Sequence, residues 1–234
     1  DLSKEDVKLG GQRISLEELC AAWMGTLEKI FPNNAQPVPV TKDVPLWEKR
    51  ENKAPAIKVA RPRVFIPAFP GTNCEVDSAR AFEKAGAQCE ILVVKNLSVS
   101  DIEETIDRME KAIRQAQIVM LPGGFSGGDE PDGSAKLITS FFRSGQVKEQ
   151  VNELLKNRDG LMLGVCNGFQ ALIKLGLVPY GEIVDTDETC PTLTFNTIGR
   201  HQSRLVRTRV ASNQSPWLMK TQPGEIYTVP ISHG

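Results

Sequence analysis

Four short apolar runs, each followed by a stretch that suits a helix, constrain the fold of this chain more than any other sequence feature. The runs cover residues 64–69, 89–94, 118–121 and 161–165. Between the second and third runs, Ile102, Ile106, Met109 and Ile113 recur at helical spacing. Continuous apolar strands that alternate with helices predict an α/β fold, with a central, mostly parallel sheet and helices on both faces.

The chain on either side of the fourth run is less regular. A long helical stretch is expected to end near residue 157, with Gly145 as a possible break. After residue 177 the helical pattern fades, and short strands are predicted at residues 192–195, 203–210 and 225–229. We therefore expect a small additional β region beside the main sheet.

The first 62 residues have a different character from the rest. Ser15 and Glu18 form a capping-box pattern, and apolar residues at helical spacing follow up to Ile30. Residues 33–62 are rich in proline and predict a linker, to which Leu46 and Trp47 could give an anchor. The predicted organisation is a helix and linker over residues 1–62 and a main domain over residues 63–234.

Composition excludes several classes of protein. The net charge of −1 gives no electrostatic footprint for nucleic acid, and no apolar run has the length of a membrane span. Five scattered cysteines suit a reduced, cytoplasmic protein, and two histidines disfavour a histidine-rich metal site. Phosphate-loop and dinucleotide-binding patterns are missing, so neither a metal nor a cofactor is predicted.

The stretch Gly164-Val165-Cys166-Asn167-Gly168 joins the fourth strand to a helix-compatible run. A strand, a tight turn with a nucleophile and a helix make up a nucleophile elbow, here with cysteine. Such a turn lifts the sulfur above the sheet beside a helix N-terminus, whose partial positive charge favours a thiolate. The alternative is that Cys166 is a small buried apolar residue, the usual position of a free cysteine.

Other candidate groups follow the same topology. Loops at the carboxyl ends of parallel strands share one edge of the sheet, which brings residues 71–74 and 123–128 near the elbow. A backbone N–H after Pro122 could then join that of Asn167 in stabilising an oxyanion. For a Cys–His pair, His233 is favoured over His201 because it is expected in a loop that follows a strand.

These motifs together resemble the class I (triad) glutamine amidotransferases. The likeness rests on the elbow through Gln170, on Leu121-Pro122-Gly123-Gly124-Phe125-Ser126 and on Pro230-Ile231-Ser232-His233-Gly234. With Phe69-Pro70-Gly71-Thr72-Asn73-Cys74, the set is similar, more narrowly, to the glutaminase family of phosphoribosylformylglycinamidine synthase, an enzyme of purine biosynthesis. It covers residues 63–234.

The resemblance implies an activity and its residues. Cys166, with His233 as base, would hydrolyse L-glutamine to glutamate and ammonia through a thioester. The residues implied for the oxyanion and the substrate are Gly124, Asn167, Gln170, Phe125 and Asn73. Residues 1–62 would be the tail of an upstream synthetase domain of the same polypeptide, which would use ATP and Mg²⁺ to convert formylglycinamide ribonucleotide to the amidine.

One departure from the family pattern concerns the triad. The family has a glutamate two residues after the histidine, whereas this sequence ends at Gly234. Because that carboxylate orients the histidine, we expect this chain to be a poor glutaminase. Two other hypotheses remain: a non-catalytic module that supports a synthetase, and a related cysteine hydrolase. Such hydrolases usually place histidine directly after the cysteine, where this chain has Asn167.

Overall fold

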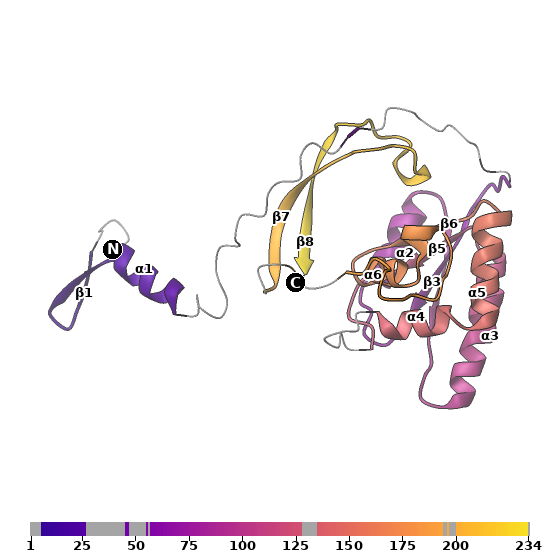
Figure 1. The fold of residues 1–234 in the computed structure, drawn as a ribbon, viewed down its shortest axis with the longest axis horizontal. Helices are drawn as coiled ribbons and strands as arrows, with labels where there is room; N and C mark the ends of the chain where they lie inside the picture. The colour runs from indigo at the N-terminus through magenta and orange to yellow at the C-terminus, as the bar shows by residue number, and fades with distance from the viewer. Residues whose placement is uncertain are drawn as a thin grey trace. The chain divides into compact units, whose positions relative to one another are not determined.

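A computed structural model describes residues 6–26, 45–46, 55, 57–127, 135–193, 196 and 200–233. The chain forms two compact units, of which one comprises Lys53–Thr194 and the other Asp1–Asn52 with Phe195–Gly234 (Figure 1). The larger unit carries the sheet, and each unit is described by itself.

The sheet of the larger unit has four parallel strands in the order β4-β3-β5-β6. They are β3 (Arg63–Ala68), β4 (Gln88–Val93), β5 (Ile118–Leu121) and β6 (Leu161–Gly164). The predicted parallel sheet is thus confirmed, and every strand boundary lies within one residue of its expected position. Because β5 and β6 pair in register from Ile118↔Leu161 to Leu121↔Gly164, the loops that follow these two strands start side by side.

Helices occupy the intervals between the strands. They are α2 (Glu75–Lys84), α3 (Val99–Gln115), α4 (Lys136–Phe142), α5 (Gly145–Asn152), α6 (Asn167–Lys174) and α7 (Leu177–Tyr180). Helix α3 begins where the Ser98 hydroxyl accepts a hydrogen bond from the Asp101 N–H, as its sequence predicts. In Figure 1, α3 and α5 lie side by side along the sheet.

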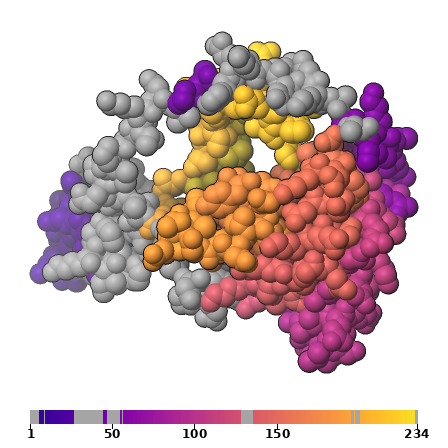
Figure 2. Space-filling view, turned by 45° about the vertical axis from the view of Figure 1, so that its right-hand side comes forward, coloured from indigo at the N-terminus to yellow at the C-terminus, as the bar shows by residue number. Residues whose placement is uncertain are grey.

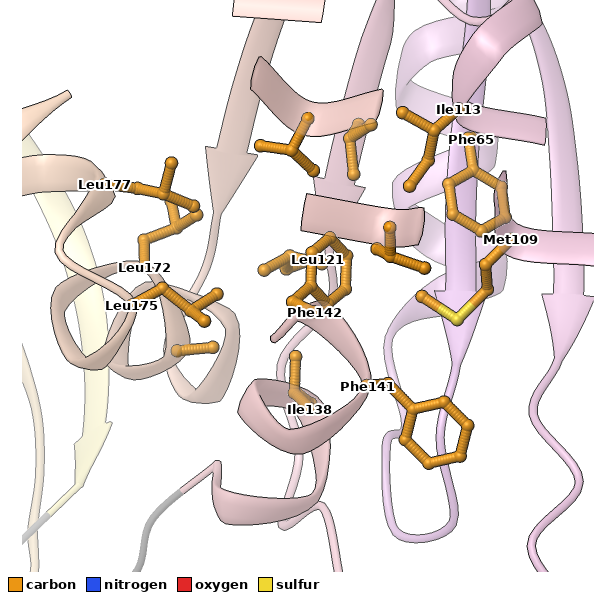
Figure 3. Packing of buried hydrophobic residues seen from close by; sticks show 14 of the residues in the cluster. Phe65, Met109, Ile113, Leu121, Ile138, Phe141, Phe142, Leu172, Leu175 and Leu177 are labelled. Atoms are coloured by element: carbon orange, nitrogen blue, oxygen red, sulfur yellow. The ribbon is translucent and has the colours of Figure 1, made fainter. Parts of the chain in front are cut away.

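The two faces of the sheet bury different side chains. Phe65, Val119 and Leu121 point into a large cluster with residues of α3, α4, α5 and α6 (Figure 3). Val64 and Ile66, their neighbours in sequence, point to the opposite face and pack with Ala79 of α2. This alternation follows from the two-residue period of a strand. Both faces are covered by helices, as expected for continuous apolar strands.

The helical stretch before β6 has the predicted break near Gly145. The chain turns at Arg143 and Ser144, and Gly145 is the first residue of α5. A π-helical turn, η1 (Glu153–Asn157), then completes the stretch. In Figure 2 the orange segment with α6 and α7 lies directly against the salmon segment of α4 and α5.

The N-terminal part of the second unit contains a hairpin that the sequence analysis missed. Strands β1 (Asp6–Leu9) and β2 (Gln12–Ser15) pair around a turn at Gly10 and Gly11, and α1 (Leu16–Gly25) follows. The capping box is confirmed, since the Ser15 hydroxyl and the Glu18 carboxylate each accept a backbone N–H of the other residue. No residue of α1 is buried in the described part of the chain.

The C-terminal part of that unit is an antiparallel pair of β7 (Gln202–Arg209) and β8 (Ile226–His233), with a 3₁₀ turn, η2 (Pro216–Leu218), between them. This pair confirms the predicted β region. Strand β8 continues to His233, so the expected loop around that histidine is wrong.

Some predicted features lie partly or wholly outside the described residues. Residues 192 and 193 form no strand, contrary to the prediction of a strand over residues 192–195, while residues 194 and 195 are not described. The helical positions 27–30 and Trp47 of the linker are likewise outside the described ranges. No helix within those ranges has the length and apolar character needed to cross a membrane.

Candidate active site

The loops after β3 and β5 are joined by their main chains at the carboxyl edge of the sheet. The Phe125 N–H donates to the Gly71 carbonyl at 2.8 Å, and the Asn73 N–H donates to the Gly123 carbonyl at 3.0 Å. Thr72 and Gly124 face each other in this short antiparallel bridge. The predicted meeting of these loops is therefore confirmed, and it depends on backbone rather than on side-chain identity.

The elbow between β6 and α6 has the predicted strand–turn–helix form. Cys166 has φ 52° and ψ −110°, a conformation that L-residues rarely adopt and that costs about 1–3 kcal/mol. Its side chain is exposed. The alternative of a buried structural cysteine is therefore wrong, and the surrounding structure holds the sulfur at a strained bend open to solvent.

Two glycines let this bend fit against the sheet. A methyl group on Gly168 would lie 2.0 Å from the Leu121 carbonyl oxygen, and one on Gly164 would lie 2.5 Å from the Gly168 carbonyl oxygen. Atoms cannot approach so closely without a backbone shift. The Gly-x-Cys-x-Gly spacing therefore reports the close packing of the first turn of α6 on β5 and β6.

Asn167 fixes the elbow to the loop after β5 through its side chain. It is fully buried, its Oδ1 accepts the Ser126 N–H at 3.1 Å, and its Nδ2 donates to Gln170 Oε1 at 3.0 Å. The resemblance assigned Asn167 a backbone role alone, so this contact was missed. The signal in the sequence is a polar residue at the first position of a helix that is expected to pack on the sheet, because a polar side chain buried there requires a hydrogen-bond partner.

Gly124 occupies a position that requires glycine. Its φ is 133°, and a methyl group there would lie 2.6 Å from both the Gly71 oxygen and the Thr72 Cα. In the bridge with Thr72, the ladder hydrogen bonds belong to the flanking residues, and the Gly124 N–H takes no part in them. The Gly124 N–H lies in the loop after β5. The Asn167 N–H lies directly after the nucleophile, at the first residue of α6.

Cys74 is a neighbour of the elbow that the sequence analysis did not assign to the site. A methyl group on Gly123 would lie 3.4 Å from Cys166 Cβ and 3.7 Å from Cys74 Sγ. Cys74 is exposed and precedes α2 as Cys166 precedes α6. Its signal in sequence was its position after the first strand, on a loop predicted to reach the elbow.

The other predicted substrate-binding residues line the same edge. Phe125 is 59% exposed, Asn73 is exposed, and Gln170 is partly buried against Asn167. An edge-to-face contact of Phe69 with Phe141, with ring centroids 5.6 Å apart, ties the start of the first loop to α4. The structure thus brings together Cys166, Gly124, Asn167, Gln170, Phe125 and Asn73.

The two histidines belong to the other unit. The backbone of His233 pairs with Gln202 at the end of β8, and His201 Nε2 is hydrogen-bonded to Ser232 Oγ at 2.9 Å. The pairing of His233 with Cys166 stays a prediction. Among the described residues, no group of three His, Cys, Asp or Glu side chains could hold a metal ion, and the expected lack of a cofactor also stays a prediction.

A cysteine at a strained strand-to-helix turn, between glycine-rich loops at the edge of a parallel sheet, has the nucleophile-elbow arrangement, which exposes a side chain that can act as a nucleophile. Residues 61–234 match the family of CobB/CobQ-like glutamine amidotransferase domains. The chain therefore belongs to this family.

Curated relatives carry a more specific name. The chain is 31% identical over 176 residues to the phosphoribosylformylglycinamidine synthase subunit PurQ of Dehalococcoides mccartyi, covering 75% of this chain and 62% of the relative. It is 36% identical over 172 residues to PurQ of Campylobacter jejuni, covering 74% and 63%. The chain thus spans about three fifths of the length of these relatives.

A solved structure has the same fold. The structure of PurLQS from Thermotoga maritima matches with a TM-score of 0.54 and 25% sequence identity, covering 74% of this chain and 67% of that one. This similarity supports the class I amidotransferase-like architecture that the sequence predicts.

Proposed function

We propose that this chain is a glutaminase domain, which hydrolyses the side-chain amide of L-glutamine to glutamate and ammonia. The observation that carries the proposal is the conformation of Cys166, an exposed residue whose backbone is strained and whose Cβ lies next to Gly123. A fold maintains such strain only where the surrounding contacts determine it, and such positions cluster at active sites.

In the first half-reaction, the Cys166 thiolate attacks the amide carbon of glutamine. The carbonyl oxygen becomes an oxyanion, to which the Gly124 and Asn167 N–H groups donate. His233, after taking the thiol proton, protonates the departing nitrogen, the C–N bond breaks, and ammonia and a glutamyl thioester remain.

In the second half-reaction, water attacks the thioester. His233 accepts a proton from this water, the C–S bond breaks, and glutamate leaves while the Cys166 thiol is restored. Gln170, Phe125 and Asn73 position the substrate at the edge of the sheet. Gln170 is hydrogen-bonded to Asn167 of the elbow, and the Asn73 N–H donates to the Gly123 carbonyl of the glycine loop.

The ammonia would serve a synthetase. The named relatives are subunits of phosphoribosylformylglycinamidine synthase, and the similar solved structure is called PurLQS. By analogy, we place this chain in the ATP-dependent amination of formylglycinamide ribonucleotide in purine biosynthesis. Residues 1–62 would belong to the synthetase part, residues 63–234 to the glutaminase, and nucleotide and Mg²⁺ to the synthetase alone.

Covalent labelling tests the proposal directly. A glutamine analogue with an electrophilic diazoketone in place of the amide should label the full chain once. The added mass should lie on the peptide that contains Cys166. Cys166→Ala should abolish the label, whereas Cys20→Ala, on exposed α1, should leave it unchanged. Labelling spread equally over several cysteines would favour the alternative of a non-catalytic supporting module.

Turnover tests the role of an acidic residue two positions after His233. Glutamate production is measured for this chain and for one extended at its C-terminus by residues that include the family glutamate. An orienting carboxylate contributes up to about 10⁴-fold to the rate of a triad. The extended chain should be faster by a large factor, and equal, robust rates would contradict the prediction.

A further inference from the structure

The edge of the sheet brings two exposed thiols together across one glycine. Cys74 ends the loop after β3, Cys166 is the elbow, and Gly123 lies between them. Because a methyl group on Gly123 would be 3.4 Å from Cys166 Cβ and 3.7 Å from Cys74 Sγ, those two atoms are separated by at most about 7 Å. Glycine contributes only hydrogen to the space between them.

Neither sulfur is committed to another contact among the described residues. Cys74 and Cys166 both precede helices without giving a side-chain capping hydrogen bond. The half-buried cysteine of β4 differs, because the Cys89 thiol donates to the Ala79 carbonyl at 3.4 Å. No hydrogen bond of either side chain therefore has to break for the sulfurs of Cys74 and Cys166 to approach each other.

We propose that Cys74 and Cys166 are an oxidation site, which hydrogen peroxide converts to an intramolecular disulfide. The Cys166 thiolate attacks one peroxide oxygen, an S–O bond forms, the O–O bond breaks, and the departing hydroxide takes a proton to become water. The peroxide is reduced, and the sulfur becomes a sulfenic acid.

Cys74 resolves this intermediate. Its thiolate attacks the Cys166 sulfur, the S–S bond forms, the S–O bond breaks, and the second hydroxide leaves as water after protonation. Two thiols and one peroxide thus yield one disulfide and two waters. The disulfide protects the Cys166 sulfur from further oxidation, and a dithiol reductant regenerates both thiols.

Peptide mapping of the full chain after treatment with a small excess of hydrogen peroxide tests the site. The wild type should yield a peptide pair joined through Cys74 and Cys166, and the intact mass should fall by two hydrogen atoms. In Cys74→Ser, Cys166 should stop as a sulfenic acid that reacts with dimedone, then progress to sulfinic acid. Cys89→Ser should form the disulfide as the wild type does.

Gly123→Ala provides a variant that keeps both thiols. The added methyl meets its neighbours at ordinary contact distances, so the fold should persist, while the space between the sulfurs is filled. Disulfide formation should slow by about tenfold or more, since exchange requires direct access of one sulfur to the other. An unchanged rate would argue against this path between the sulfurs and overturn the proposal.

The result is independent of glutamine turnover. Accumulation of dimedone-reactive Cys166 in the wild type, with Cys74 still free, would overturn the disulfide and leave the proposed glutaminase untouched. Conversely, a chain that forms the disulfide but takes no label from the diazoketone analogue would retain this site and lose the proposed function. Where both hold, peroxide should lower labelling by about tenfold, and dithiothreitol should restore it in the wild type.

Discussion

The side-chain oxygen of Asn167 accepts a hydrogen bond from the backbone N–H of Ser126 at 3.1 Å, across 41 positions of sequence. The first turn of α6 and the loop after β5 are therefore fixed to each other inside the protein. Because Asn167 is fully buried, water cannot replace this bond. The position of the elbow relative to Gly124 thus depends on the side chain of Asn167.

Asn167→Ala should lower both stability and reactivity. The buried Ser126 N–H would lose its acceptor, at a cost of about 1–3 kcal/mol in the free energy of unfolding, measured with urea. The rate of labelling by the diazoketone analogue should fall as well. Gln170→Ala, which removes only the second bond of Asn167, should have the smaller effect on stability. Equal losses in the two variants would contradict this account.

Gly168→Ala should disrupt the elbow. Its methyl would lie 2.0 Å from the Leu121 carbonyl oxygen, so α6 must move away from β5, at a cost of about 3 kcal/mol. Gly145→Ala is the matched control, since no heavy atom of the described residues lies within 4 Å of its added methyl and the position begins α5. Thermal melting should show a large loss for the first variant and no loss for the second.

Arg158 joins the end of α3 to the turn that follows η1. Its guanidinium donates to the carbonyls of Ile113, Arg114 and Ala116 at 2.7–3.0 Å. Burial lowers the pKa of this guanidinium, and the charge of Glu153 opposes that effect.

Arg158→Ala should therefore lower the free energy of unfolding by about 2 kcal/mol, because helix-end carbonyls lose their donors. As a control, Arg108→Ala removes an exposed arginine of α3, whose ion pair with Glu104 is 3.8 Å long. That control should change stability by about 0.5 kcal/mol or less. A similar result for both arginines in urea titrations would show that the carbonyl contacts contribute little.

The Cys89 thiol should react with alkylating agents only at raised pH. Burial, and to a lesser extent the charge of Glu83, raises the pKa of this thiol above its ordinary value. The folded state therefore binds the thiol proton more tightly than the unfolded state does. The stability that this contributes is present below the ordinary thiol pKa and is lost as pH rises through the raised one.

Alkylation rates of Cys89, followed by peptide mapping as a function of pH, provide the measurement. The midpoint for the folded chain should lie above the midpoint for the same cysteine in urea. Coincident midpoints would show that the packing around Ala79 and Glu83 has no effect on the thiol.

The sheet was predictable from sequence because strands buried on both faces are apolar throughout, as in Val64, Phe65 and Ile66. The elbow was predictable because its glycines mark close approaches of the backbone. The loop of Cys74 was expected near the elbow, but the position of its thiol across Gly123 from Cys166 was not predictable, since it depends on β3 lying beside β5, and strand order has no local signature. The β1–β2 hairpin was missed because each strand has only four residues and Ile14 is the single apolar residue of β2, so the alternating pattern is too short to recognise.

The main-chain bridge between Thr72 and Gly124 has a consequence for how such a site can change over generations. Shape constrains Gly71 and Gly124, since each has a positive φ and no room for a methyl group, while the Phe125 side chain takes no part in the pairing. Substitutions of the exposed Phe125 can therefore alter what enters the rim without displacing the nucleophile. A scaffold of this kind can acquire a new preference for substrate or partner by point mutation and still preserve its chemistry.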